Sequence, residues 1–341
     1  MREVPEPALT RWEPPTYTVD ANGKVVGGTP GPIHNWGRWG DSDQRGTANL
    51  LTAERAVEAA ALVRTGKRFA LGLPIGGLAA PSHRGEPLHL FQIATGDAIL
   101  TGAGTDGADD YLVMALQGTT QLDGLGHVGR GNLMYNGFWS GLVTAGTGAR
   151  RLGVHHLATG LVGRGVVLDV ARAQGVPWLE PGFPITAALL DGTAAAQGVD
   201  VRPGDILFVR TGTVTHWYER FGSPTAPFQR LGDETARRDL LDGPEAGLAW
   251  DTVQWLRDHD VAVLGVDNLA VECRPAQPGH TWIDFHVAAL RDLGLPLAEV
   301  LDLDALAADC AEDGVWEGQC AVSVLPVVGA VGSPINPLFI K

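Results

Sequence analysis

Short apolar runs separated by turn residues recur along most of the chain. Several are almost continuous in hydrophobicity, as expected for strands buried in the centre of a sheet. The predicted strands are FALGLPI (69–75), HLFQIAT (89–95), DYLVMALQG (110–118), GRGVVLDV (163–170), DILFVRTG (205–212), VAVLGVDNLAVE (261–272) and AVSVLPVVGA (321–330).

Helical spacing of alanine, valine and leucine replaces the strand pattern in a few segments. The clearest is 52–65, where Thr52 is a candidate N-cap and Arg55 stands in place of the glutamate of a capping box. Further helices are predicted at about 186–196, 245–259 and 285–293. The 46 glycines indicate many turns and long loops. The pattern as a whole predicts an α/β fold with a mixed, β-rich core and flanking helices.

The first 30 residues differ in composition from the rest of the chain. They are rich in proline and lead into NGKVVGGTPGP, which is typical of an extended segment. No linker or internal repeat interrupts the remainder. We therefore predict an extended N-terminal arm over 1–30 and a single domain over 31–341.

The formal net charge of −14 limits the partners of this protein. Nucleic acids and anionic membranes are both bound through clustered lysine and arginine, so we expect neither as a partner. No apolar run approaches the roughly 18 residues that a membrane helix needs. The N-terminal stretch also lacks the apolar core of a signal peptide. These features predict a cytoplasmic protein that acts on a small-molecule substrate.

Two other patterns do not indicate a site. Cys273, Cys310 and Cys320 are an odd number without C-x-x-C spacing, so we expect reduced cysteines in the core. GAGTDG (102–107) has the letters of a dinucleotide fingerprint, but a predicted strand follows it where that motif requires a helix. We interpret it as a glycine-rich loop.

The stretch LQGTTQLDGLGH (116–127) is the main candidate for chemistry. It places Asp123 and His127 four residues apart, and Gln117 and Gln121 lie just upstream. Carboxylates and imidazoles are common ligands of divalent metals and the usual acid and base groups of enzymes. The stretch therefore predicts a metal site, an acid/base site or a polar turn.

Other histidines lie in apolar or aromatic surroundings. His280 and His286, in PGHTWIDFHVAAL, flank the start of a predicted helix, and Glu299 follows them. His216, in THWYERFG, has aromatic neighbours and is a candidate for lining a pocket. Each could equally be a structural histidine, and spacing alone does not show that these side chains converge.

These motifs, in this order, resemble the cyclase family that includes bacterial kynurenine formamidase and isatin hydrolase. That family is marked by His-x-Gly-Thr-His-x-Asp-x-Pro-x-His and, later, by a His that a Glu follows after about a dozen residues. The resemblance covers about residues 35–330 and implies the swivelling β/β/α fold of that family, with a catalytic domain over 31–341. It rests also on WGRWGDSDQRGTANLL, TGLVGRGVVLDVAR, GVDVRPGDILFVRTG, GVDNLAVECRP and FHVAALRDLGLPLAEVLDLDALA.

The chain departs from the family motif at two histidines, which fall on Gln117 and Gln121. The form TQLDGLGH is similar to a longer-chained branch of these cyclases, so we interpret the exchange as a character of that branch. The positions that match the family are Asp123, His127, His286 and Glu299.

The resemblance also implies roles for the matching residues. Asp123, His286 and Glu299 would be metal ligands, and His127 would be the general acid/base beside Asp123 and Glu299. A glutamine carbonyl is a weaker donor than imidazole. We therefore expect Gln117 and Gln121 to bind substrate. We expect the same role for His216 and His280. Mn²⁺ or Zn²⁺ is compatible with the remaining ligands, but the exchange slightly favours catalysis without a metal.

Three functions remain open at this stage. The family points to a hydrolase of small amides, cyclic amides or lactones. The altered ligand set points to a metal-independent cyclase, dehydratase or isomerase of a specialised metabolite, with His127 as acid/base. A ligand-binding protein without activity is the third. The resemblance further implies a homodimer or homotetramer, for which Trp12, Trp36 and Trp39 are candidate contacts.

Overall fold

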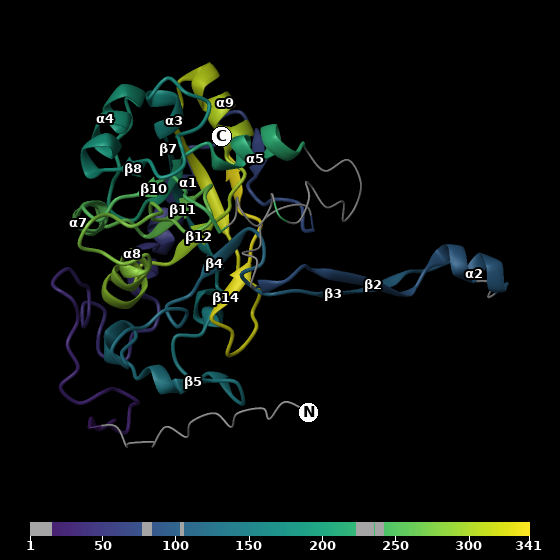
Figure 1. Cartoon of the computed structure of the whole chain (residues 1–341). Coiled ribbons are helices and arrows are strands. Elements are labelled where there is room, and N and C mark those ends of the chain that lie inside the picture. Colours follow the sequence, from purple (N-terminus) through teal and green to yellow (C-terminus); the bar gives the residue numbers. More distant parts are fainter. Residues whose placement is uncertain (1–15, 77–83, 103–105, 223–234, 236–241) are drawn as a thin grey trace, which may run out of the picture.

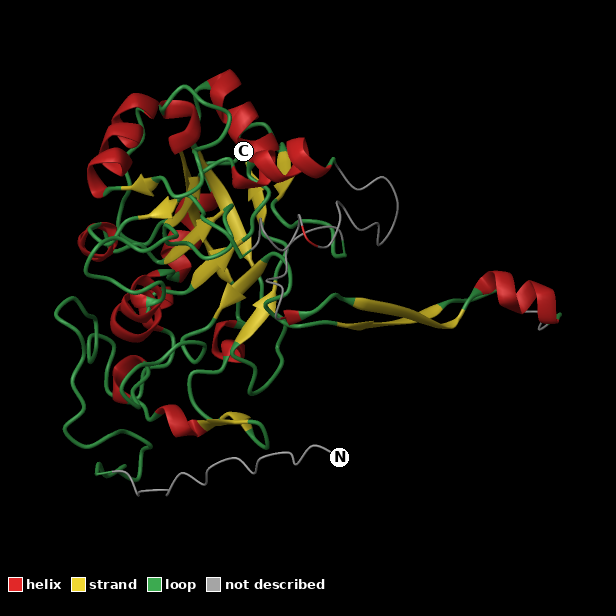
Figure 2. Cartoon of the chain, in the orientation of Figure 1, coloured by secondary structure: helices red, strands yellow, loops and turns green. Residues whose placement is uncertain are grey.

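The computed structural model describes residues 16–76, 84–102, 106–222, 235 and 242–341. Figures 1 and 2 show a body built around a central sheet and a long β-hairpin that leaves it. Residues 1–15 of the predicted arm lie outside the described part, and 16–30 lie along the body without a helix, where Val25 N donates to Gly137 O. Within the described ranges, no helix has the length and apolarity needed to cross a membrane.

A nine-stranded mixed sheet forms the centre of the body. Strands β7, β9, β11 and β12 run parallel in its middle, and antiparallel strands continue it on both sides. In sheet order the strands are β1 (Arg68–Ala70), β15 (Leu338–Ile340), β13 (Glu317–Val322), β7 (Leu161–Asp169), β9 (Ile206–Arg210), β11 (Val263–Val266), β12 (Leu297–Glu299), β4 (Gln121–Asp123) and β14 (Gly332–Pro334). This arrangement confirms the predicted mixed α/β class.

The continuous apolar runs of the sequence correspond to the central strands of the sheet. All residues of β9 and β11 are buried, as their continuous hydrophobicity predicts. Three further two-stranded sheets are short pairings outside this core. They are β10 (Gly247–Leu248) with β8 (Pro184–Ile185), β5 (Val143–Thr144) with β6 (Gly148–Ala149), and β2 (Leu88–Ile93) with β3 (Asp109–Val113).

The helices and single turns cover the sheet and join its strands. The α-helices are α1 (Ala53–Ala60), α2 (Thr95–Thr101), α3 (Val170–Ala173), α4 (Ala187–Gln197), α5 (Thr213–Phe221), α7 (Thr252–Asp258), α8 (Asp284–His286) and α9 (Asp304–Asp313). The 3₁₀ turns are η1 (Gly46–Leu50), η3 (Tyr135–Gly137), η4 (Ser140–Leu142) and η5 (Val154–Leu157), and η6 (Val287–Leu293) is a π-helix that continues α8.

Several predicted boundaries were wrong, for local reasons. Thr52 caps α1 as predicted, but the helix ends at Ala60. The backbone N–H of Ala61 donates to the carbonyls of both Val57 and Glu58, and a turn follows in place of a further helical turn. The predicted helix 245–259 begins only at Thr252, because 247–248 pair as β10. Strand β13 ends at Val322, so most of 321–330 is loop.

The runs 89–95 and 110–118 form strands, but not central ones. They pair with each other as β2 and β3 in the hairpin that projects from the body, and most of their apolar side chains are exposed. Burial predicted from hydrophobicity was therefore wrong for this pair. A strand follows GAGTDG, as predicted, although 103–105 lie outside the described residues.

Gly46 is required where η1 meets the end of the π-helix. Its φ is +58°, and a Cβ there would lie 1.9 Å from the backbone oxygen of Gly294. We expect Gly46→Ala to lower the free energy of unfolding by about 3 kcal/mol or more, since both backbone strain and a backbone clash oppose it. Urea unfolding measures this loss.

Gly27→Ala is the matched control for this prediction. Gly27 also has a positive φ, +75°, but nothing lies within 4 Å of its Cβ position. Only the backbone cost of roughly 1–2 kcal/mol should appear there. Equal losses in the two variants would contradict the proposed clash.

Candidate active site

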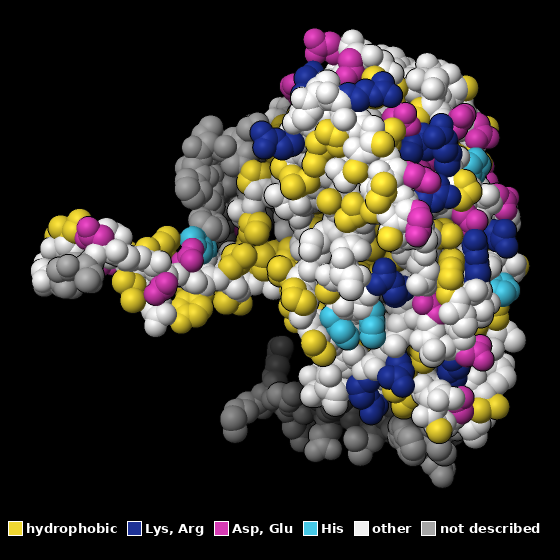
Figure 3. All heavy atoms as spheres, turned by 180° about the vertical axis from the view of Figure 1, so that it is seen from behind, with side chains coloured by type: hydrophobic (Ala, Val, Ile, Leu, Met, Phe, Trp, Pro, Cys, Tyr) yellow, Lys and Arg dark blue, Asp and Glu magenta, His cyan; other side chains and the backbone are white. Residues whose placement is uncertain are grey.

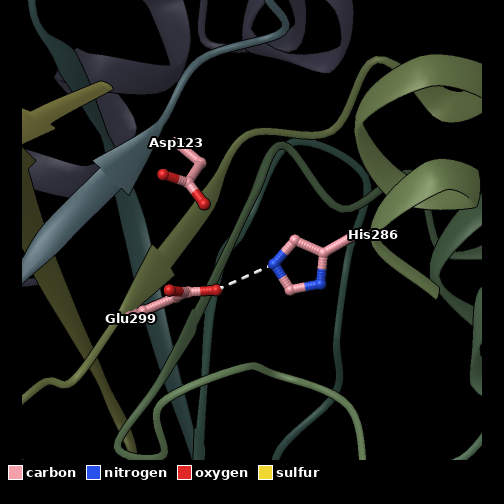
Figure 4. A group of neighbouring side chains, drawn as sticks. All are labelled: Asp123, His286 and Glu299. Atoms are coloured by element: carbon pink, nitrogen blue, oxygen red, sulfur yellow. Dashed lines mark hydrogen bonds and ion pairs between the residues drawn. The ribbon is translucent and has the colours of Figure 1, made fainter. Parts of the chain in front are cut away.

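The predicted site residues meet where β4, β12 and α8 come together (Figure 4). Strands β4 and β12 pair antiparallel, with Gln121 opposite Glu299. Residues two apart on a strand share a face, so Asp123 lies on the same face as Gln121 and Glu299. His286, at the end of α8, points its ring toward the two carboxylates. The sheet therefore joins the two halves of the motif, which lie far apart in sequence.

The distances within the site show a compact polar cluster. His286 Nε2 lies 3.0 Å from Glu299 Oε1, and Gln121 Nε2 donates to Glu299 Oε2 at 2.6 Å. One donor atom from each of Asp123, His286 and Glu299 lies within 4.8 Å of the donor atoms of the other two. His127 Nε2 lies 3.6 Å from Asp123 Oδ2. Five residues singled out from the sequence, Gln121 included, are therefore neighbours in space.

Glu272 is a further member of the site that the sequence analysis missed. Its Oε2 lies 2.5 Å from His286 Nδ1, so His286 is held between two carboxylates. Glu272 stands within GVDNLAVECRP, one of the matching segments, but its distance of 14 residues from His286 follows no period that would indicate a contact. Only the folded loop after β11 brings the two together.

Burial controls the protonation of the carboxylate and of the histidine at its side. Asp123 is 1% exposed, and its burial raises its pKa to about 6. Burial lowers the pKa of His127, which Asp123 only partly offsets. Burial alone would also lower the pKa of His286, but Glu272 and Glu299 together raise it well above its usual value. At neutral pH, His127 is therefore uncharged and able to accept a proton.

Several buried polar atoms around Asp123 have no hydrogen-bond partner among the described residues. They are both carboxylate oxygens of Asp123, Nε2 of Gln117, Oγ1 of Thr119 and Oε1 of Glu272. Unpaired buried oxygens are costly, so a native site normally gives them a ligand. The unpaired oxygens make Asp123 the candidate point at which a bound group would be received.

The same atoms test whether a divalent cation fits. Asp123, His286 and Glu299 offer oxygen and nitrogen donors of the types that Mn²⁺ and Zn²⁺ accept. Glu272 is bonded to Nδ1 of His286, the ring nitrogen that faces away from Glu299. A histidine that binds a metal through one ring nitrogen commonly donates from the other to a carboxylate in this way. Gln121 directs its amide nitrogen to Glu299, so it offers no oxygen in this arrangement. Three donors therefore fit a cation and Gln121 does not.

The other two histidines singled out from the sequence stack on tryptophan rings, and one of them, His280, lines a pocket together with Glu272. His216, on α5, stacks on Trp178 with ring centroids 5.0 Å apart, and His280 stacks on Trp250 at 4.4 Å. Among the described residues, no hydrogen bond or ion pair joins either histidine to Asp123 or His127. Their substrate-binding roles stay predictions.

Fold and site together define a mixed α/β protein with a buried centre of carboxylates and imidazoles. The Cyclase family model matches residues 46–273, and the chain belongs to this family. A crystal structure titled as a novel cyclase is 39% identical, with a TM-score of 0.81, and the match covers 91% of this chain and 100% of that one. The predicted family and fold are thus confirmed.

More distant structures share the fold. An isatin hydrolase bound to the product analogue thioisatinate is 17% identical, with a TM-score of 0.54, over 84% of this chain and 98% of that one. Isatin hydrolase A from Labrenzia aggregata, bound to benzyl benzoate, is 16% identical, also with a TM-score of 0.54, over 84% and 97%. A search of curated proteins finds no match.

Proposed function

We propose that this protein is a hydrolase that opens a small amide, cyclic amide or lactone. The observation that carries the proposal is the pair formed by His127, uncharged at neutral pH, and Asp123, whose buried oxygens accept no hydrogen bond from any described residue. A base beside an unpaired carboxylate in a buried polar site is what activation of water at a carbonyl requires. The distant isatin hydrolases, which share this fold, support the same class of reaction.

His127 is suited to move the proton in this reaction. Its side chain is 21% exposed, whereas that of Asp123 is 1% exposed, so the imidazole lies on the solvent side of the carboxylate. In the proposed reaction His127 takes a proton from water, and the oxygen adds to the carbonyl carbon. When the C–N or C–O bond breaks, the same imidazole returns the proton to the leaving atom.

Asp123, His286 and Glu299 would hold a divalent cation in this enzyme. Such a cation supplies Lewis-acid polarisation of a carbonyl and acidifies a water molecule. Glu272 keeps the His286 ring oriented, and Gln117, whose buried Nε2 has no hydrogen-bond partner among the described residues, would donate a hydrogen bond to a substrate oxygen. The protein residues therefore bind, orient and transfer protons around one point.

Turnover of defined substrates tests the proposal. N-formyl aryl amides, isatin and simple lactones are offered to the purified protein with and without added Mn²⁺ or Zn²⁺. We expect hydrolysis of at least one class, with stimulation by the metal. Absence of turnover of every one of these substrates in both conditions would refute a hydrolase of this kind.

One observation favours a second function. Both oxygens of Glu299 and both nitrogens of His286 already have partners inside the protein. A metal-independent cyclase, dehydratase or isomerase could use this preformed network, with His127 as acid/base. Activity that survives treatment with EDTA favours this function. Activity that is lost to EDTA and restored by metal favours the hydrolase.

Glu272→Gln tests the orienting role of Glu272 through cation binding. The variant removes the charge that faces His286 Nδ1, so we expect Mn²⁺ affinity to fall by about 10- to 100-fold. Isothermal titration of the metal-free protein measures this directly. Asp260→Asn, which changes a carboxylate bonded to Arg38, is the control and should leave Mn²⁺ affinity unchanged. An affinity for Glu272→Gln within threefold of the unchanged protein would contradict the role.

A further inference from the structure

One arginine lies alone in the part of the chain that carries the candidate catalytic pair. Between residues 69 and 129, Arg84 is the only lysine or arginine. Figure 3 shows apolar, acidic and histidine side chains along the hairpin that follows it, whereas the lysines and arginines visible from this side lie on the body. The segment that leads to Asp123 and His127 therefore has a single permanent positive charge.

The hairpin of β2 and β3 places Arg84 opposite Gln117. Leu88 pairs with Val113, and the same register continued four residues toward the body sets Arg84 against Gln117. Arg84 Nη1 donates to Gln117 O at 2.7 Å, which agrees with this position. The chain then enters β4, where Figure 1 shows the hairpin joining the body. Arg84 is thus held at the point where the hairpin meets the sheet.

Gln117 connects Arg84 with the centre of the site. A Cβ added to Gly332 would lie 2.4 Å from Gln117 Nε2, so this amide packs directly against Gly332. Gly332, on β14, is the register partner of Asp123 on β4. Only one residue, Gln117, therefore separates Arg84 from the strand pair that carries Asp123.

The charge of Arg84 acts on both members of the candidate catalytic pair. Burial has the largest effect on each of them, since it raises the pKa of Asp123 to about 6 and lowers the pKa of His127. The Arg84 charge acts to lower the pKa of both groups. Charges act over roughly 10 Å at 0.1 M salt. The guanidinium is therefore near enough to contact a ligand bound at the pair.

Most of the hydrogen-bonding capacity of Arg84 is unused. A guanidinium has five N–H donors in a planar fork. In the described part of the chain, Arg84 makes one hydrogen bond, to Gln117 O, and no ion pair with a carboxylate. Arg164 and Arg210, by contrast, each pair with a buried aspartate. The edge formed by Nε and Nη2 of Arg84 matches the two oxygens of a carboxylate.

The other charges of the site limit which anion can bind. Asp123, Glu272 and Glu299 place three buried carboxyl groups around His286. They repel an approaching anion, and the repulsion grows with its charge. One guanidinium offsets a single negative charge, so a carboxylate fits this site better than a phosphate dianion.

We propose that Arg84 binds a carboxylate carried by the substrate, so that the amide, cyclic amide or lactone opened beside Asp123 and His127 is an acidic one. This substrate class rests on the proposed function. The carboxylate pairs with Nε and Nη2 of Arg84, and the carbonyl to be attacked lies on the Asp123 side of Gln117. Arg84 thus determines specificity and takes no part in proton transfer.

Binding of two small ligands to the chelator-treated full chain tests this subsite without turnover. Benzoate and benzamide share a ring and differ in charge, and removal of metals ensures that no cation holds the carboxylate. By NMR titration, we expect benzoate to bind at least about tenfold more tightly than benzamide, and Arg84→Met to remove this preference. Arg84→Lys should retain part of it, because the charge stays while the fork is lost.

Arg38→Met is the matched control, since Arg38 is bonded to Asp260 and should leave the preference unchanged. Near-ultraviolet circular dichroism shows whether each variant is folded. If Arg84 only braced Gln117, its loss would weaken both ligands equally, and that result would overturn the proposal. Absence of benzoate binding, equal affinities in the unchanged protein, or a preference that persists in Arg84→Met would overturn it too.

The location of the anion is tested by diffraction from crystals soaked in para-bromobenzoate. The anomalous signal of bromine shows where the ring lies, and we expect the carboxylate at Arg84. Bromine found only at other places would contradict the subsite.

Turnover separates a failure of this substrate class from a failure of the proposed function. If N-formyl aryl amides are hydrolysed, meta-formamidobenzoate should have a higher kcat/KM than formanilide. Arg84→Met should lower kcat/KM for the acid by about 10- to 100-fold, mainly through KM. Hydrolysis without this difference would overturn the substrate class and leave the hydrolase in place. Absence of all turnover, with the benzoate preference intact, would contradict the hydrolase and leave the anion subsite in place.

Discussion

Replacing His127 with alanine is expected to lower kcat by about 10²- to 10⁴-fold while the fold is kept. His127 Nε2 faces Asp123 at 3.6 Å, and burial lowers the pKa of its imidazole, so the ring is uncharged at pH 7 and can take a proton. Its backbone N–H donates to Gly124 O, a bond that alanine retains. The loss should therefore appear in turnover and not in stability.

The measurement is kcat on the substrate that the unchanged protein turns over best, together with the thermal midpoint of both proteins. His259→Ala is the matched control. His259 stacks on Trp255 and lines a groove with residues of α4, so its loss should leave kcat within about twofold. If His127→Ala retained a third or more of the activity, His127 would not be the acid/base group.

Sequence reasoning predicted the central strands because their pattern depends only on burial. Strands β9 and β11 are buried on both faces, and continuous hydrophobicity predicts that state directly. Strands β4 and β12 were not predicted, because three residues are too few to show an alternation of apolar and polar positions. They are nevertheless the strands that carry Asp123 and Glu299, and motif matching found these residues without their elements.

The hairpin of β2 and β3 shows the opposite error. Its strands have the hydrophobicity of a core, yet Leu90 and Tyr111 face outward in this chain. The sequence pattern indicates hydrophobic strands, and it does not indicate whether their side chains are buried in the core of the same chain. The sequence analysis missed Glu272 for another reason. Its contact with His286 depends on the conformation of a loop, and loops have no hydrophobic periodicity from which a contact can be predicted.

The π-helix after α8 also lies beyond what periodicity can predict. The sequence predicts a helix over 285–293, and the helix is there, but η6 is wound more widely than an α-helix. Such segments are frequent at functional sites. Here it directly follows His286 and ends at Gly294, whose positive φ of 65° closes the helix against Tyr135. The altered winding therefore begins directly after a residue of the candidate site.

Adding Mn²⁺ to chelator-treated protein is expected to raise its thermal midpoint, and Asp123→Asn is expected to abolish that rise. At about 100 times the dissociation constant, a bound ligand stabilises by about 2.7 kcal/mol. For a chain of 341 residues this corresponds to a shift of about 4 °C. The variant should also lose hydrolytic activity, because Asp123 supplies one of the three donors.

The stability of the metal-free Asp123→Asn protein separates loss of the cation from damage to the fold. Neither oxygen of Asp123 has a hydrogen-bond partner among the described residues, so the change removes no bond and should not lower the midpoint. Asp267→Asn gives the contrast. Asp267 accepts from Thr211 N, Thr211 Oγ1 and Gly212 N, and an amide can accept at only one atom.

Asp267→Asn should therefore lose about 2–3 kcal/mol of stability and still respond to Mn²⁺. A thermal shift that persists in Asp123→Asn would place the cation at another site. If the unchanged protein shows no shift with Mn²⁺ or Zn²⁺, the metal-dependent hydrolase is contradicted, and the network of His127, Asp123 and Glu299 must work alone. The same two variants thus decide what the unpaired oxygens of Asp123 receive.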